Sequence, residues 1–225
     1  MFSKSKLTDE SAAWMRFGLE HGDAALASLG LNLPGETDSV VRNAGLIAIR
    51  VSPDRAELWA QADQADAIKA NLSAALPETE LNQWLLGQIR AGIGQVMPST
   101  RELFIPQMLN LQAVGGVSFK KGCYTGQEIV ARMQYLGKLK RRLYRLSLNA
   151  TEMPAPGTPL FSPSHNSAIG EVVIAAKADQ SVELLAVLQA EAADSGDVHL
   201  GNLEGPGLQL LDLPYTLDRD REIQR

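Results

Sequence analysis

Two hydrophobic periods alternate along the first 142 residues. Runs of apolar residues with period two or with no break predict strands at 1–6, 13–17, 40–41, 46–51 and 57–60. Apolar residues spaced by three and four predict helices at 23–29, 63–76 and 80–91. Gly30 is placed to end the first helix in a left-handed cap, and Ser52-Pro53-Asp54 to form a turn. Strands that alternate with helices in this way predict a mixed α/β layer.

The pattern changes near Arg142. Leu146 and Leu148 alternate with polar residues, and strand-like runs follow at 169–175, 182–188 and 208–213. Proline and glycine turn signals separate these runs, and no helical period is present. Such a pattern is typical of a small β-barrel or sandwich. We therefore predict an α+β protein with two domains, a mixed α/β body over residues 1–142 and a C-terminal β-barrel over residues 143–225.

Composition narrows the class of protein. The chain has 225 residues, a single cysteine and a formal net charge of −5. One cysteine excludes an internal disulfide. The first six residues lack the apolar stretch of a signal peptide, and no segment approaches the roughly 20 apolar residues that span a bilayer. We expect a cytoplasmic protein without a membrane partner.

Residues 115–128 hold the most distinctive chemistry of the chain. They include four glycines within twelve residues, which let the backbone turn tightly and approach a ligand closely: Gly115, Gly116, Gly122 and Gly126. Thr125 and Glu128 fit a capping box, which predicts that a helix begins there. Ile129, Met133 and Leu136 would give that helix an apolar stripe.

Cys123 would then lie just ahead of a helix N-terminus, beside Lys120 and Lys121. A helix dipole and nearby positive charge both stabilise a thiolate, so a lowered pKa is expected. The alternative is that Cys123 is a small buried core residue. A Cys–His nucleophile with one of the three histidines (His21, His165, His199) is a further alternative, although none of them lies in a recognisable motif. Three histidines and one cysteine form no familiar cage for zinc, so no metal site is expected.

Positive charge is concentrated in residues 120–145. The segment contains one acidic residue, Glu128, and eight basic residues, so its net charge is +7. The basic residues are Lys120, Lys121, Arg132, Lys138, Lys140, Arg141, Arg142 and Arg145. Such a segment can bind a polyglutamate tail or a phosphate backbone, or it can be an ordinary solvated surface. Trp84, on the third predicted helix, is either a core residue or a flat surface on which a heterocycle stacks.

Three stretches of the sequence closely resemble the YgfZ folate-binding proteins: Phe104-Ile105-Pro106-Gln107, Asn110-Leu111-Gln112 and residues 115–132. That family is related to the glycine cleavage aminomethyltransferase and to a mitochondrial iron–sulfur assembly factor. Its hallmark is the sequence K-G-C-Y-x-G-Q-E, here residues 121–128. Weaker similarity covers nearly the whole chain.

The resemblance implies an aminomethyltransferase-like, folate-binding α/β body followed by a small β-barrel, with tetrahydrofolate or a derivative as the cofactor. It implies a role in supporting iron–sulfur enzymes or their assembly factors and in tRNA modification, with tRNA as a candidate partner. By the same resemblance Lys121 and Cys123 are the functional lysine and cysteine, and Trp84 contacts folate. The rest of the motif would complete the cofactor site: Gly122, Tyr124, Gln127 and Glu128. Four residues of the basic segment would hold an anion or nucleic acid: Lys138, Lys140, Arg141 and Arg142.

Two departures from the family pattern change the expectations. The chain begins inside that pattern, so about the first third of the family's length has no counterpart, and we expect weaker folate binding and exposed strand edges. Arg90 stands where the aminomethyltransferase has a glutamate before Ala-Gly, which argues against that reaction. We favour a non-catalytic folate-binding accessory factor. A folate-dependent aminomethyltransferase and a tRNA-binding module that uses residues 120–145 are the alternatives.

Overall fold

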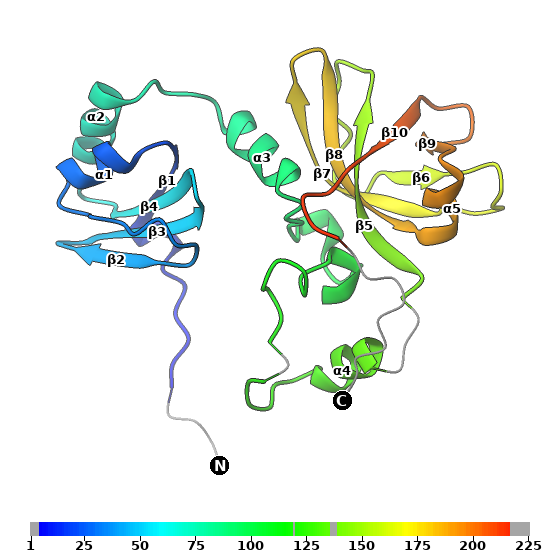
Figure 1. Ribbon diagram of the computed structural model, residues 1–225, viewed down its shortest axis with the longest axis horizontal. Coiled ribbons are helices and arrows are strands. Elements are labelled where there is room, and N and C mark those ends of the chain that lie inside the picture. The colour runs from blue at the N-terminus through cyan, green and yellow to red at the C-terminus, as the bar shows by residue number, and fades with distance from the viewer. Residues whose placement is uncertain (1–4, 119, 136–138, 217–225) are drawn as a thin grey trace. The chain divides into compact units, whose positions relative to one another are not determined.

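The computed structural model describes residues 5–118, 120–135 and 139–216. The chain divides into two compact units, residues 1–79 and 80–225, which are described one at a time (Figure 1). The predicted domain boundary lies further along the chain, between residues 142 and 143. The assignment of residues 1–142 to a folate-binding domain stays a prediction.

The first unit is a four-stranded antiparallel sheet with two helices on one face (Figure 1). The strand order is β1-β4-β3-β2. Its elements in chain order are the 3-10 turn η1 (Ser11–Ala13), β1 (Trp14–Glu20), α1 (Asp23–Ser28), β2 (Val40–Asn43), β3 (Leu46–Ser52), β4 (Arg55–Gln61) and α2 (Ala65–Ala75).

Alternate strand residues of this sheet face the helices. Ala56, Leu58 and Ala60 of β4 are buried, and they share one core with Leu26 of α1 and Leu72 of α2. Successive side chains of a strand point to opposite faces, so this period of two is what one buried face produces. The predicted strands at 13–17, 46–51 and 57–60 and the predicted helices at 23–29 and 63–76 are confirmed.

Two turns of the first unit use left-handed backbone. Gly30 has φ +75° and the N–H of Leu31 donates to the oxygen of Leu26, which makes a Schellman motif at the end of α1. The predicted left-handed cap is therefore confirmed. Ala44 and Gly45, with φ of 42° and 84°, form the two-residue turn between β2 and β3. Positive φ at both positions is typical of a type I′ hairpin.

The second unit is a closed six-stranded β-barrel with helices packed outside it (Figure 1). Around the barrel the order is β10-β5-β8-β7-β6-β9. The strands are β5 (Arg141–Leu148), β6 (Pro159–Phe161), β7 (Gly170–Ala178), β8 (Ser181–Gln189), β9 (Val198–Leu200) and β10 (Gly207–Leu211). The helices are α3 (Leu81–Arg90), η2 (Pro98–Thr100), η3 (Pro106–Leu109), α4 (Gln127–Tyr135) and α5 (Ala190–Ser195).

Strand β8 is buried on both of its faces. Every residue from Val182 to Leu188 is buried. Leu184 belongs to the core inside the barrel, whereas Leu185 packs outside it in a cluster with Leu86 and Ile89 of α3. A strand with two covered faces has no solvent-facing side, which explains why all of its buried residues are apolar except Glu183. The barrel that this pattern predicted is confirmed, together with the mixed α/β class of the whole chain.

The predicted strand at 1–6 is not formed where the structure describes it. Ser5 and Lys6 belong to no strand, and residues 1–4 lie outside the described residues. In the first unit β1 is an edge strand that is hydrogen-bonded to β4 alone, and among the described residues no strand pairs with its other edge. No helix of the described residues combines the length and the apolar character needed to cross a bilayer.

Candidate functional site

Cys123 lies in a turn between η3 and α4, and its side chain is exposed. In the same turn the Nζ of Lys121 is 4.4 Å from the centre of the Tyr124 ring, a cation–π contact. Gly115 and Gly126, on either side, have φ of 75° and 85°, which favours glycine. The alternative in which Cys123 fills the core is therefore wrong, and the sulfur is accessible to a reaction partner.

Helix α4 begins at Gln127, and its cap differs from the predicted one. The N–H of Tyr124 donates to Oε1 of Gln127 at 3.2 Å, and the N–H of Val130 donates to the oxygen of Gly126. The side chain that accepts the capping hydrogen bond is therefore that of Gln127, and not that of Glu128 as the capping box predicts. The side chain of Glu128 is exposed. Because Gly126 adopts left-handed backbone, the helix begins after it and not at Thr125.

One hydrogen bond from η3 anchors α4. The Nε2 of buried Gln107 donates to the oxygen of Val130 at 2.5 Å. Val130 is buried, whereas Ile129 is 60% exposed. The predicted stripe is therefore wrong at Ile129, because the face that meets η3 carries Val130. Leu136 lies outside the described residues.

Asn110 joins the same region to the barrel. It follows η3 in left-handed backbone (φ 54°), and its Nδ2 donates to the oxygen of Leu143 on β5 at 2.9 Å. The hydroxyl of Tyr215 donates to the oxygen of Gly92, at 2.8 Å, just after α3. Burial raises the pKa of Tyr215 above its ordinary value. These residues did not stand out as functional in the sequence, although the resemblance included Asn110 and Gln107.

Three buried amide oxygens in this stretch have no hydrogen-bond partner among the described residues: Oε1 of Gln107, Oδ1 of Asn110 and Oε1 of Gln112. A buried acceptor without a donor costs about 1–3 kcal/mol. Nearly all such groups are paired in folded proteins, with protein groups or with ordered water, so three within six residues set this stretch apart.

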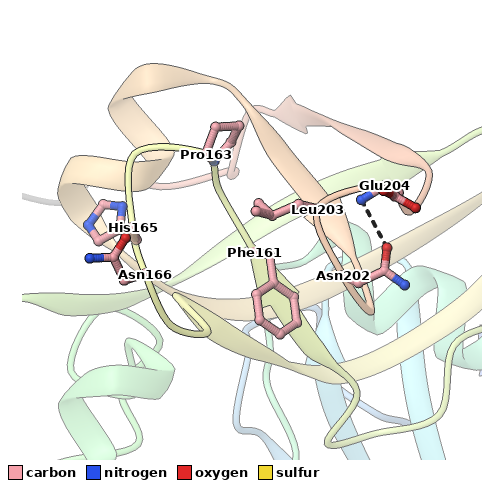
Figure 2. Close-up of a pocket in the computed structure, with 7 residues that line it drawn as sticks. All are labelled: Phe161, Pro163, His165, Asn166, Asn202, Leu203 and Glu204. Atoms are coloured by element: carbon pink, nitrogen blue, oxygen red, sulfur yellow. Dashed lines mark hydrogen bonds between the residues drawn. The ribbon is translucent and has the colours of Figure 1, made fainter.

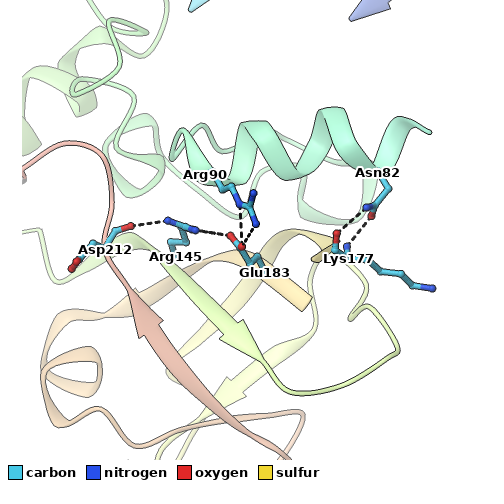
Figure 3. A network of polar contacts seen from close by, with 6 residues as sticks. All are labelled: Asn82, Arg90, Arg145, Lys177, Glu183 and Asp212. Atoms are coloured by element: carbon cyan, nitrogen blue, oxygen red, sulfur yellow. Dashed lines mark hydrogen bonds and ion pairs between the residues drawn. The ribbon is translucent and has the colours of Figure 1, made fainter. Parts of the chain in front are cut away.

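Trp84 lies on α3 and is partly buried. A polar cluster fixes this helix to the barrel (Figure 3). Glu183 of β8 accepts hydrogen bonds from Arg90 of α3, at 2.8 Å, and from Arg145 of β5, at 2.7 Å. At the other end of α3, Asn82 exchanges two hydrogen bonds with the backbone of Lys177. Trp84 therefore comes from α3, whereas Cys123 comes from the segment before α4.

The basic segment is partly neutralised by the barrel. Arg141 forms an ion pair with Glu171, and Arg145 with Glu183. Arg142 is partly buried, whereas Lys140 is exposed. The remaining exposed cations of the segment are Lys120, Lys121 and Arg132, and Lys138 lies outside the described residues.

All three histidines lie away from the motif in the sequence, and the side chains of two of them have local hydrogen bonds. His165 Nδ1 is 2.9 Å from the hydroxyl of Ser164, and His199 contacts Asp197 and the oxygen of Gly205. Within the described ranges, no three His, Cys, Asp or Glu side chains come together as metal ligands.

Two open cavities are found elsewhere. One of about 580 Å³ lies between the β6–β7 and β9–β10 loops of the barrel (Figure 2). The other, of about 620 Å³, lies in the first unit beside the ends of β1 and β4. Trp84 and Cys123 line neither of them.

Comparison with known proteins finds relatives along almost the whole chain. The chain is 36% identical over 220 residues to the tRNA-modifying protein YgfZ of Photobacterium profundum, and the match covers 95% of this chain and 66% of that protein. It is 34% identical over 202 residues to the protein of the same name of Yersinia pestis, covering 88% of this chain and 61% of that protein. The chain thus spans less than two thirds of the length of these relatives. No family model matches.

A solved structure has a similar fold. The glycine cleavage system aminomethyltransferase T from Bartonella henselae superposes with a TM-score of 0.55 at 17% sequence identity, covering 85% of this chain and 56% of that protein. At that identity the likeness concerns the fold alone.

Proposed function

Because this chain belongs to the YgfZ family, we propose that it is a tetrahydrofolate-binding accessory protein in tRNA modification, and that it supports iron–sulfur enzymes through Cys123. One observation carries the proposal. The only cysteine of the chain is exposed, two residues after Lys121 and just before the hydrogen-bonded turn at Tyr124–Gln127 that opens α4. An accessible thiol near positive charge has the surroundings in which a sulfur acts as a nucleophile or as a ligand.

The three orphaned amide oxygens support a folate site. A tetrahydropterin ring carries N–H groups along its edge, and donors of that kind would satisfy Gln107, Asn110 and Gln112. Since Gln107 also holds α4 through Val130, a ligand that contacts its amide would be coupled to the helix that follows Cys123. When bound, the folate would supply a carrier for a one-carbon unit.

Two further residue groups would complete the site. The indole of Trp84 is proposed to stack on the pterin, for which its flat surface is suited. The exposed ammonium groups of Lys120, Lys121 and Lys140 would attract the glutamate tail. Arg141 contributes less to that attraction, because Glu171 compensates its charge.

The folate proposal is tested with the variant Gln112→Leu. Removing an unsatisfied buried amide should leave the melting temperature unchanged or raised, while the loss of an acceptor weakens tetrahydrofolate binding about tenfold. Anaerobic calorimetric titration measures the binding, and Trp59→Phe, in the first unit, is the control. Equal affinity of the original chain and Gln112→Leu, or no binding by either, contradicts the proposal.

The thiol proposal is tested separately by complementation. In cells that lack their own family member, Cys123→Ala should fail to restore thiolated nucleosides in tRNA, whereas the original chain restores them. The control Thr125→Ala, in the same turn, should restore them as well as the original chain does. Full restoration by Cys123→Ala would rule out a role for the sulfur.

Two other functions remain as alternatives. One is the activity named for the solved structure of similar fold, an aminomethyltransferase, which would form methylene-tetrahydrofolate from an aminomethyl-lipoyl carrier protein. Against it, Arg90 is engaged with Glu183 as a structural contact of α3. A tRNA-binding module that uses residues 120–145 would bind RNA with an affinity that falls steeply with salt. Neither methylene-tetrahydrofolate formation nor salt-sensitive RNA binding is expected of the accessory protein by itself.

A further inference from the structure

The barrel carries an open pocket that the proposed function does not use (Figure 2). It lies between two loops, residues 162–169 after β6 and residues 201–206 after β9, and has a volume of about 580 Å³. Phe161, Pro163 and Leu203 make its apolar part, and Glu204 lies on its rim. Leu203 is 48% exposed. Exposed apolar side chains gathered around a concave surface are typical of an interaction site.

The loop that presents Leu203 and Glu204 is held by hydrogen bonds. The N–H of Glu204 donates to Oδ1 of Asn202 at 2.9 Å, and the N–H of Gly205 donates to the oxygen of Asn202 at 3.0 Å. The ring of His199 lies 3.0 Å from the oxygen of Gly205. A Cβ at Gly205 would come within 1.9 Å of the Leu200 oxygen, so the turn requires glycine.

This local order matters for binding. An apolar residue on a preorganised loop can bind a partner with little loss of conformational entropy. Leu203 is therefore exposed in a defined position, which distinguishes it from the apolar residues that any surface exposes singly.

The barrel has more acidic than basic residues. From the start of β5, residues 141–216 contain nine aspartates and glutamates against one lysine (Lys177) and three arginines, all of them in β5. Glu171 and Glu183 are paired with arginines, and Asp197 lies beside His199. Among the described residues Glu204 forms no ion pair, so its charge is available at the pocket. A negative surface with an apolar centre attracts positive charge next to an apolar anchor.

We propose that this pocket docks a basic segment of a partner protein, in which an apolar side chain enters between Phe161, Pro163 and Leu203 while an adjacent lysine or arginine pairs with Glu204. Nucleic acid fits this surface poorly, because a phosphate backbone would meet the carboxylate of Glu204 at the pocket, on a barrel where nine acidic residues outnumber four basic ones over residues 141–216. The pocket thus gives the barrel a protein-docking role, separate from the chemistry of Cys123.

The test uses the full chain and a fluorescein-labelled peptide of nine residues, in which leucines and arginines alternate. Binding is followed by fluorescence anisotropy, and amide NMR shifts locate the contact. We expect saturable binding with shifts at residues 161–166 and 202–204, weakened about tenfold in Leu203→Ser and in Glu204→Gln. Leu210→Ser and Glu191→Gln, which change an exposed leucine and an exposed glutamate of the same barrel outside the pocket, should bind as the original chain does.

Specific outcomes would overturn the proposal. One is the absence of binding below about 1 mM peptide. Another is equal binding of a peptide with glutamates in place of the arginines. Displacement of the labelled peptide by a single-stranded oligonucleotide that causes shifts at the same loops would assign the pocket to RNA. Loss of binding in the two control variants would show that total charge or fold, and not the pocket, governs the interaction.

Discussion

At the scale of single residues, the backbone conformation determines which residue types suit a tight turn. Ala44 has φ +42° in the hairpin between β2 and β3, a region that costs an L-residue about 1–2 kcal/mol. Its neighbour Gly45 adopts φ +84° without that cost. The sequence Asn43-Ala44-Gly45 therefore departs from the Asn-Gly pair that type I′ turns favour.

Replacing Ala44 by asparagine should stabilise the first unit. Asparagine tolerates left-handed backbone, and Ala44 is exposed, so Ala44→Asn should raise the free energy of unfolding by about 0.5–1 kcal/mol. Urea denaturation followed by circular dichroism measures the change. Gly45→Ala is the opposing control, because its new Cβ would meet Oε1 of Gln61 at 2.7 Å in strained backbone. A destabilised Ala44→Asn variant would contradict the argument.

At the scale of elements, α3 is held on the barrel both by an apolar cluster and by polar contacts. Burial by itself would raise the pKa of Glu183, but the hydrogen bonds from Arg90 and Arg145 outweigh it and hold the pKa below its ordinary value. A carboxyl group whose pKa is lower in the folded state stabilises the fold above its unfolded pKa. That contribution is lost as the pH falls through the folded pKa.

The stability of the second unit should therefore depend on pH through Glu183. Between pH 7 and about pH 5 the contribution should be constant, and it should decline below the ordinary glutamate pKa of about 4.3. Glu183→Gln should lower the free energy of unfolding at pH 7 by roughly 1–3 kcal/mol and flatten this part of the acid dependence. Thermal unfolding across pH 3–7 measures both effects. An unchanged acid dependence in Glu183→Gln would show that other carboxylates dominate.

At the scale of the whole molecule, the two units have separate cores. The core of the first unit joins α1 and α2 to the sheet, and those of the second lie inside the barrel and between α3, η3 and the barrel. Charge is also divided, because the basic segment 120–145 precedes the acidic barrel sequence 146–216. A domain with its own core can fold by itself.

Each unit should fold when it is produced alone. Fragments 1–79 and 80–225 are expected to unfold cooperatively with urea, since each keeps the core that its elements share. Circular dichroism and amide NMR dispersion are the measurements. The larger fragment should have the steeper transition, because the slope grows with the surface exposed on unfolding. A fragment 80–225 without a cooperative transition would contradict the division at residue 79, and a fragment cut at 142–143 is the matched comparison.

Local periodicity made most elements predictable. It failed where the structure of a segment depends on a neighbouring element that is distant in sequence. The Schellman cap at Gly30 and the strands of the sheet depend on residues close in sequence, so their pattern was sufficient. The strand expected at 1–6 needs a neighbouring strand, which the described residues do not supply at Ser5 and Lys6. The buried side of α4 depended on the position of η3, and the sequence could not reveal it.

By itself the sequence determined most of the strands and helices, the glycine-rich segment with its cysteine, and the family, but it missed β6, α5 and β9 in the barrel. The features that it determined follow from spacings of a few residues and from a contiguous motif. Tertiary structure alone decided that Cys123 is exposed, that Glu183 binds arginines 93 and 38 residues away, and that the loops after β6 and β9 enclose a pocket. The physical reason is that barrel closure and burial bring distant residues together, and their charges and surfaces acquire a role only once they meet.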